Sequence, residues 1–259
     1  MSLDWSEISP IIFRGAGGAA FVLCNAETWT RWHIVAWIFI IVLGLELVSW
    51  LVHLFGRVTA SRLIDHRGKH LDQLEPLDIA FVVFNKTLTS LFTFQWLCYM
   101  RDAPSGTTVN WNIESIGVAS FALSISALYV VYDFFYTVFH RVLHQRWIYR
   151  YVHKHHHRQK APSRGNTDAV NVHPVEFIGG EYNHLLALHL VASYIMPVHA
   201  AAAMIFLVAG GFIASLNHTR YDIRAPFMPW LYQVSKQAAK SSCSSSTQFL
   251  RSSLSTDNR

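Results

Sequence analysis

Charged residues are scarce in this chain of 259 residues, where they account for 14% of positions, against about 25% in a typical soluble domain. A single water-soluble domain is therefore not expected. Cysteine is also rare, and Cys24, Cys98 and Cys243 are too widely spaced for a disulfide framework or a metal-binding pair. No signal peptide is apparent, because the first long apolar run begins only at Trp32 and is too long for one.

Apolar residues, in contrast, make up 52% of the chain, and they include 17 Phe, 10 Tyr and 9 Trp. So much aromatic surface excludes disorder as the dominant state. The formal net charge of +5 fits basic cytoplasmic loops of a membrane protein better than nucleic-acid binding, so no nucleic-acid partner is expected.

A membrane-spanning helix needs about 20 mostly apolar residues. Three stretches meet this requirement, at Trp32–Phe55, about Asp78–Met100 and about Ile113–Phe139. A fourth apolar region, about Phe177–Leu216, is long enough for two short spans or one re-entrant hairpin, with Pro197 as a natural break. The sequence therefore predicts an all-α integral membrane protein with three to four spans.

Two charges, Glu46 and Lys86, fall inside these apolar stretches. They are either functional intramembrane charges or a helix-packing contact with a snorkelling lysine, and the sequence favours the second interpretation.

The distribution of basic residues predicts the orientation. The loop after the first span and the segment after the third are rich in Lys and Arg, whereas the loop after the second span contributes Arg101 alone. The first and third of these connections are therefore expected in the cytosol. The basic residues concerned are Arg57, Arg62, Arg67 and Lys69 in the first, and Arg141, Arg146, Arg150, Lys154, Arg158, Lys160 and Arg164 in the third.

Histidine is abundant: of 15 histidines, eleven lie between His140 and His218. His140 and His144 are four residues apart, which places both imidazoles on one helical face, where they can hold one metal ion. His153, His156 and His157 repeat this helical spacing on a following helix, whereas His155 points to the opposite side and is not expected to be a ligand. Two such clusters at one end of a span predict a metal site on a cytosolic helical cap, and imidazole suits iron, zinc and copper.

Further polar residues accompany these clusters. Asp133 lies two turns before His140 on the same stripe, and Asn171, His173 and Glu176 would support or complete the site. His218 and Asp222 follow in the segment NHTRYD. His184, His189 and His199 lie in apolar sequence without ligand spacing, and we expect them to be packed, hydrogen-bonded residues.

These motifs resemble the fatty acid hydroxylase superfamily, which includes sterol desaturases and lipid hydroxylases. The similarity rests on HRVLH at His140, HKHHH at His153, VHPVE at His173 and NHTRYD at His218. The resemblance implies a di-iron site and O2-dependent hydroxylation or desaturation of a sterol or fatty-acyl lipid. It also implies an endoplasmic reticulum membrane and electrons from a separate reductase or small haem carrier. The implied iron ligands are His140, His144, His153, His156, His157, His173 and His218. Asp133, Asn171 and Glu176 are expected as hydrogen-bonding partners of the ligands, and Asp222 either as such a partner or as a replacement ligand.

With this resemblance, the chain divides into an N-terminal segment (1–31), membrane helices (32–112), a partial fatty acid hydroxylase-like region (113–237) and a Ser-rich tail (238–259) expected to be disordered.

One element of the family pattern is not found. A further box of the form H-D-x-H-H is expected near Ala238, but no histidine follows His218. The change in composition near Gln237 suggests an altered C-terminus, and seven imidazoles would hold one metal well and a second poorly. We therefore expect weak or no activity from this chain. The alternative is an inactive scaffold or regulatory isoform. A metal transporter is disfavoured, because its ligands would lie within the spans.

Overall fold

The structure is a computed structural model, which describes residues 31–59, 62–63, 73–112, 117–158 and 162–222. These residues fall into two compact units. The first comprises residues up to Leu54 together with Asp65–Arg220, and the second comprises Phe55–Ile64 and the chain from Tyr221 onward. The Ser-rich tail and the N-terminal segment up to residue 30 lie outside the described residues.

Four of the described helices are long and apolar enough to cross a membrane: α2 (Arg31–Thr59), α3 (Pro76–Arg101), α4 (Val118–Leu143) and α8 (Ala200–Asn217). This confirms the prediction of an all-α membrane protein. The expected boundaries of the third span were too early, because α4 begins at Val118 and continues past Phe139 to include His140.

The fourth apolar region forms two helices on either side of Pro197, and of these α8 is long and apolar enough to cross a membrane. The helix α7 (Pro174–Leu190) continues into the π-helical turn η6 (Val191–Ile195), and Met196 before the proline is extended, with φ −164° and ψ 154°. Both α7 and α8 begin with a histidine whose Nδ1 accepts a backbone N–H: His173 accepts from Val175, and His199 from Ala201.

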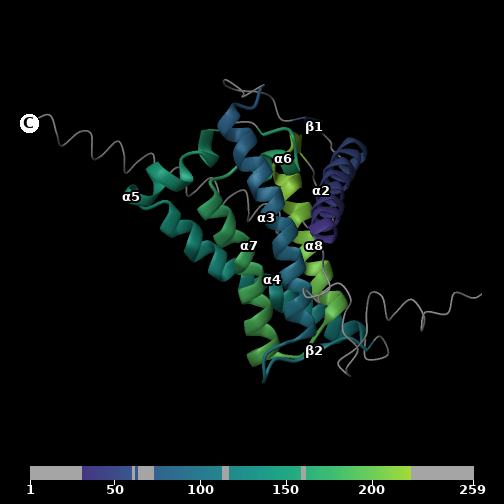
Figure 1. Ribbon diagram of the computed structural model, residues 1–259. Coiled ribbons are helices and arrows are strands. Elements are labelled where there is room, and N and C mark those ends of the chain that lie inside the picture. Colours follow the sequence, from purple (N-terminus) through teal and green to yellow (C-terminus); the bar gives the residue numbers. More distant parts are fainter. Residues whose placement is uncertain (1–30, 60–61, 64–72, 113–116, 159–161, 223–259) are drawn as a thin grey trace, which may run out of the picture. The chain divides into compact units, whose positions relative to one another are not determined.

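The first unit is a bundle in which α3, α4, α7 and α8 run side by side (Figure 1), with α7 packed against both α3 and α4. Its core contains Trp96, Phe92, Leu128 and Phe206, all at most 1% exposed. The helix α7 approaches α4 closely at Gly179, where an added Cβ atom would clash with the ring of Phe139. The site described below depends on this tight α4–α7 contact.

Polar contacts join α2 to α3 within the apolar region. Lys86, which is 8% exposed, forms an ion pair with Glu46, and Trp37 Nε1 donates to the Ser90 carbonyl at 2.7 Å. The structure thus supports the packing interpretation of the two intramembrane charges.

The strands are only two residues long. In the first unit, β2 (Val109–Asn110) pairs in parallel with β3 (Val198–His199). In the second unit, β1 (Arg62–Leu63) pairs antiparallel with β4 (Tyr221–Asp222). They do not alter the helical fold class.

Candidate metal centre

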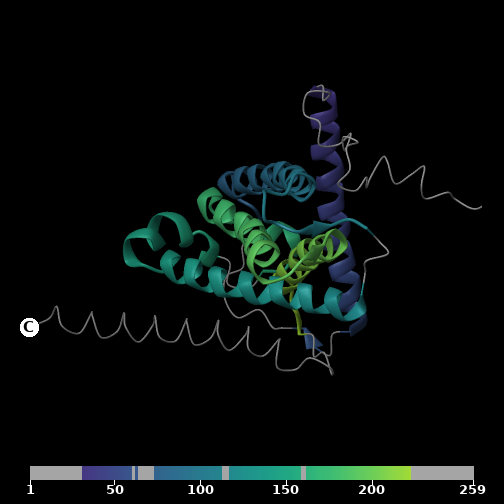
Figure 2. The same ribbon diagram turned by 90° about the horizontal axis from the view of Figure 1, so that it is seen from below.

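The site forms where the chain reverses direction after α4 (Figure 2). The helix places His140 in its last turn and ends with His144 as its C-cap. The short helix α5 (Arg146–Ile148) then leads into the π-helical turn η4 (Tyr149–His153), which packs against both α4 and α7. This return brings His153 back over the end of α4 and buries it completely, with 0% exposed.

Residues 153–157 do not form the one regular helix that the spacing predicted, yet the rings of His153, His156 and His157 lie together, with centroids 4.6 to 5.6 Å apart. The Lys154 N–H bonds the Tyr149 carbonyl at 2.7 Å in a π-helical turn, and residues His156–Arg158 form a separate 3-10 turn, η5. Although the backbone changes from one helix type to the other, the ring of His156 still stacks against that of His153, and His157 meets His153 through its Nε2 atom.

Four imidazoles nevertheless converge through their Nε2 atoms. His140 Nε2 lies 3.2 Å from His144 Nε2, and His144 Nε2 lies 3.2 Å from His153 Nε2. His157 Nε2 approaches His153 Nε2 to 2.9 Å. Ligand nitrogens of His140, His144 and His153 all lie within 4.8 Å of one another, as required of a group that binds one ion.

Glu176, on the first turn of α7, determines which nitrogen of His153 is free. Its Oε1 lies 2.9 Å from His153 Nδ1, and because a carboxylate only accepts, neutral His153 carries its proton on Nδ1. Its Nε2 therefore presents a lone pair to the cluster. This is the arrangement in which a carboxylate orients a metal-binding histidine, and it places Glu176 where the sequence predicted a supporting residue.

The cluster geometry fits a cation. The single lone pair of His153 Nε2 faces two nitrogens, which neutral imidazoles cannot fully satisfy with hydrogen bonds. Two nitrogens that each bind an ion at about 2.1 Å, at right angles to one another, lie about 3.0 Å apart. The observed separations of 2.9 to 3.2 Å match that value.

A second, smaller histidine group lies beside the first. The ring of His156 is 5.6 Å from that of His153 and 5.6 Å from that of His218, the C-cap residue of α8. His218 Nδ1 donates to the Ala214 carbonyl at 2.8 Å, which leaves its Nε2 with a lone pair. The Nδ1 atom of His156 is buried without a hydrogen-bond partner among the described residues.

Burial and mutual proximity lower the pKa values of four of these imidazoles, which favours their uncharged form. Desolvation, with a contribution from His153, lowers the pKa of His144. His157 lies at the exposed edge of the cluster, yet desolvation of its ring, together with His153 and His144, lowers its pKa to about 4. Burial likewise lowers the pKa values of His156 and His218. Neutral imidazole is the form that binds a metal.

The structure places His173 outside the converging group. Its Nδ1 accepts the Val175 N–H at 3.2 Å as the N-cap of α7, and its ring contacts Phe81. His173 is therefore not close to the other six predicted ligands. Its position directly before Pro174 makes it the N-cap residue of α7.

The other proposed supporting residues also lie elsewhere. Asp133 is exposed on α4, and Asn171 binds His155 and Asp78 in place of a cluster histidine. Asp222 lies in β4 of the second unit, and its side chain is outside the described residues.

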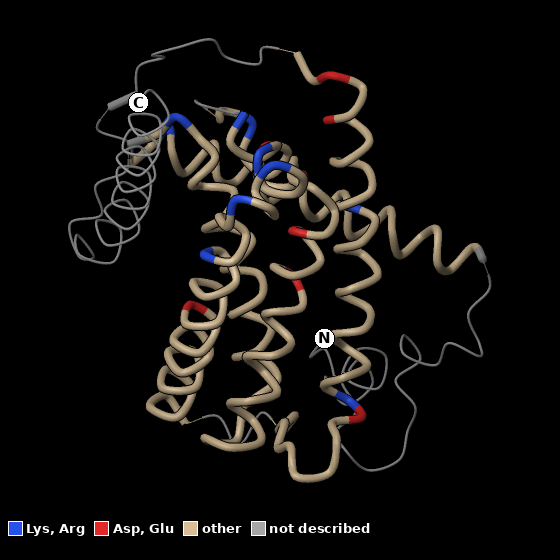
Figure 3. The backbone as a smooth tube through the Cα atoms, turned by 90° about the vertical axis from the view of Figure 1, so that its left-hand side faces the viewer, with Lys and Arg blue, Asp and Glu red and all other residues tan. Residues whose placement is uncertain are grey.

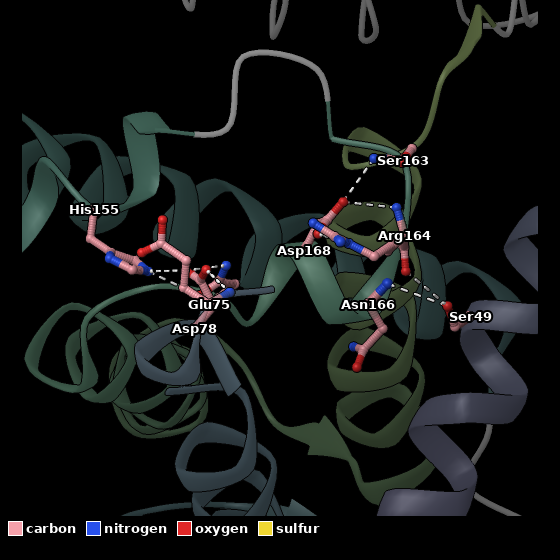
Figure 4. A network of polar contacts seen from close by, with 9 residues as sticks. Ser49, Glu75, Asp78, His155, Ser163, Arg164, Asn166 and Asp168 are labelled. Atoms are coloured by element: carbon pink, nitrogen blue, oxygen red, sulfur yellow. Dashed lines mark hydrogen bonds and ion pairs between the residues drawn. The ribbon is translucent and has the colours of Figure 1, made fainter. Parts of the chain in front are cut away.

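Two buried aspartates that the sequence analysis missed hold the loops around the site (Figure 4). Asp78, near the start of α3, lies within 3.0 Å of His155 Nε2. Asp168, in the short helix α6 (Asn166–Ala169), accepts from Ser163 N, Arg164 N and Arg164 Nε at 2.7 to 2.8 Å. The adjoining Gly165, with φ +59°, donates its N–H to the His218 carbonyl at 3.1 Å. The sequence contained one indication of a structural role for Asp78, the segment Glu-Pro-Leu-Asp at residues 75–78. This segment forms a capping box at the start of α3.

His184, His189 and His199 behave as packed, hydrogen-bonded residues, as predicted. His184 Nδ1 contacts the Glu181 carbonyl, His189 Nδ1 contacts Tyr99 Oη at 2.7 Å, and His199 caps α8.

Comparison with known families matches residues 125–241 to the family described as fatty acid hydroxylase. The matched region contains all seven predicted ligands, His173 among them. No match was found among curated proteins or among solved structures.

Proposed function

Because residues 125–241 match the fatty acid hydroxylase family, we propose that the protein is a membrane-bound, O2-dependent oxygenase that hydroxylates or desaturates a lipid with iron. The observation that carries this proposal is the convergence of four imidazole Nε2 atoms at the end of a membrane-spanning helix. A lipid substrate requires a site at the membrane, whereas a soluble electron donor requires that the site also face water. The end of α4 meets both requirements.

His140, His144, His153 and His157 would hold the first iron. Bound iron would supply the O2-activating redox chemistry needed to attack an unreactive C–H bond. The protein's own contribution is to hold the four Nε2 atoms in successive contact, with His140, His144 and His153 close enough together to bind one ion. Glu176 does this for His153 by accepting its Nδ1 proton, and the buried position of the ring excludes water from that side.

The second iron position is less complete. His156 and His218 are the two histidines beside the first group, whereas two octahedral irons share about ten to twelve donor positions. Glu176 offers one additional buried donor, because its Oε2 has no hydrogen-bond partner among the described residues. We therefore expect strong binding of one iron and weak binding of a second, with correspondingly weak turnover.

The lipid chain would bind in a groove between α4 and α7. Its walls are mostly apolar, its volume is about 480 Å³, and it is formed by Phe135, Val138, Phe139, Gly179, Tyr182, Asn183 and Leu186. A volume of this size is typical of small-molecule sites, which span about 300 to 1,000 Å³. The groove ends at Phe139 and Gly179, next to His140 on α4 and one turn from Glu176 on α7, so a chain lying in it would extend toward the histidines.

The charge distribution supports a cytosolic position for the histidine cluster. Lys and Arg gather at the end of the bundle where α4 ends (Figure 3), and residues 134–167 contain no Asp or Glu. By the positive-inside rule this end faces the cytosol. We accordingly propose a multi-pass protein of the endoplasmic reticulum that receives electrons from a separate reductase or small haem carrier.

The test is iron content followed by lipid turnover, measured on the chain purified in mild detergent from iron-replete cells. Bound iron and an O2-dependent hydroxylated or desaturated lipid would support the oxygenase. Bound iron without turnover would favour an inactive scaffold or regulatory isoform. The proposal would be refuted if the wild-type chain bound no iron, so that its iron content equalled that of His144→Ala.

A further inference from the structure

Asp78 is a buried carboxylate that binds three separate parts of the chain. Its side chain is 1% exposed, and Oδ1 lies 3.0 Å from His155 Nε2 and 3.1 Å from Asn171 Nδ2. Its other oxygen accepts the Glu75 N–H at 2.8 Å. Asp78 therefore connects the start of α3 both to the loop that carries the cluster histidines and to the segment that leads into α7 (Figure 4).

These contacts fix the chemical state of His155. Its Nε2 faces two acceptors, the Asp78 carboxylate and Asn171 Oδ1, each at 3.0 Å. An imidazole nitrogen between two acceptors must carry a hydrogen, so Nε2 of His155 offers no lone pair to a metal ion. His155 thus differs from its neighbours His156 and His157 although all three have the same side chain.

The contact continues along one stripe of α3. Phe81, three residues after Asp78, packs edge-on against the His155 ring with centroids 4.8 Å apart. Asn85, one more turn along, donates from Nδ2 to the Val170 and Val172 carbonyls at 2.8 and 2.9 Å. Residues 78, 81 and 85 lie on one face of α3, because they are three and four residues apart. They contact His155 in the loop that carries His153, and residues 170–172 in the segment that precedes Glu176.

We propose that Asp78 and His155 form a clamp that positions the histidine loop, so that His153 and His157 face His140 and His144. Both are positioning residues and bind no metal themselves. The clamp acts through the backbone, because His155 lies two residues from His153 and two from His157. This inference rests on the proposed metal centre, which it extends outward to α3.

Two substitutions at one position separate a clamp from a ligand. In His155→Gln, the side-chain amide can still donate to Asp78, whereas His155→Leu removes the donor. Cobalt(II), added to the metal-free full-length chain in detergent, reports binding through its visible absorption spectrum. We expect His155→Gln to bind cobalt within about threefold of wild type, and His155→Leu about 10- to 100-fold more weakly, the usual loss when an outer partner is removed. Equal losses in the two variants would overturn the clamp.

His153→Gln and Arg158→Gln are the matched controls from the same loop. Glutamine at position 153 cannot replace the imidazole lone pair, so cobalt binding should fall further than in His155→Leu. Arg158 pairs with Glu75 at 2.7 Å at the protein surface, and loss of this exposed ion pair should leave the cobalt spectrum unchanged.

Hydrogen exchange on the metal-free chain tests the clamp without any metal. His155→Leu should increase amide exchange in the peptides covering residues 152–158 and 170–173, and leave those from the Pro197 region unchanged. If wild type binds no cobalt, the proposed function fails and this exchange result alone decides on the clamp. Identical exchange in wild type and His155→Leu would refute it.

Discussion

Glu176 provides the sharpest test of how the protein prepares its metal centre. The carboxylate is 7% exposed, and its Oε1 accepts the Nδ1 proton of His153 at 2.9 Å. In Glu176→Gln, the amide oxygen can still accept this proton, but the negative charge is lost. A hydrogen bond to a charged group contributes about 1.5 to 3 kcal/mol, against about 0.5 to 1.5 kcal/mol for a neutral one.

The expected loss in iron affinity follows from that difference. About 1.4 kcal/mol corresponds to a tenfold change in a binding constant, and the iron's positive charge would also lose a nearby negative partner. We therefore expect Glu176→Gln to bind iron about 10- to 100-fold more weakly. Stability should fall too, because the amide NH2 group would replace Oε2, which is buried without a partner among the described residues. An unsatisfied buried donor costs about 1 to 3 kcal/mol.

Glu181→Gln is the matched control on the same helix. Glu181 lies five residues further along α7, and its Oε1 accepts the hydroxyl of Thr89 at 2.8 Å, which a glutamine oxygen can also do. The assay is an iron titration of each variant in detergent, with unfolding followed in parallel. The reasoning fails if Glu176→Gln binds iron as wild type does, or if Glu181→Gln weakens binding equally.

Two further predictions concern packing in the bundle. Gly179→Ala should destabilise the protein by about 1 to 3 kcal/mol through overpacking, because the added Cβ would lie 2.3 Å from Phe139 Cζ. Gly180→Ala should destabilise the protein far less, because its Cβ would lie 4.0 Å from the nearest atom, Tyr136 Cε2. Unfolding curves in detergent that shift equally for the two variants would contradict the overpacking argument. Glu46→Ala should leave the buried ammonium of Lys86 unpaired and cost about 3 to 5 kcal/mol. Adding Lys86→Met should recover most of that loss, and a double variant no more stable than Glu46→Ala would refute the pairing argument.

Local spacing predicted part of the site well. His140 and His144 lie on one regular helix, so a separation of four residues sets their relative position, and the structure brings their Nε2 atoms to 3.2 Å. The four spans were predictable for the same reason, since apolar length decides whether a helix can cross a bilayer. In both cases the relevant interaction lies within one element, and the sequence alone contains the information.

The second histidine group shows why the rest was not predictable. The pattern at residues 153–157 has helical spacing, yet the backbone changes from a π-helical to a 3-10 turn within it. Which histidine faces the cluster then depends on partners far away in the sequence: Glu176 binds His153, and Asp78 binds His155. Asp78 lies 77 positions before His155, and no periodicity in the loop itself points to it. Six histidines within eighteen positions thus acquire different roles from the hydrogen-bond partners that tertiary packing places opposite them. The same principle explains why His173, which precedes a proline, caps a helix.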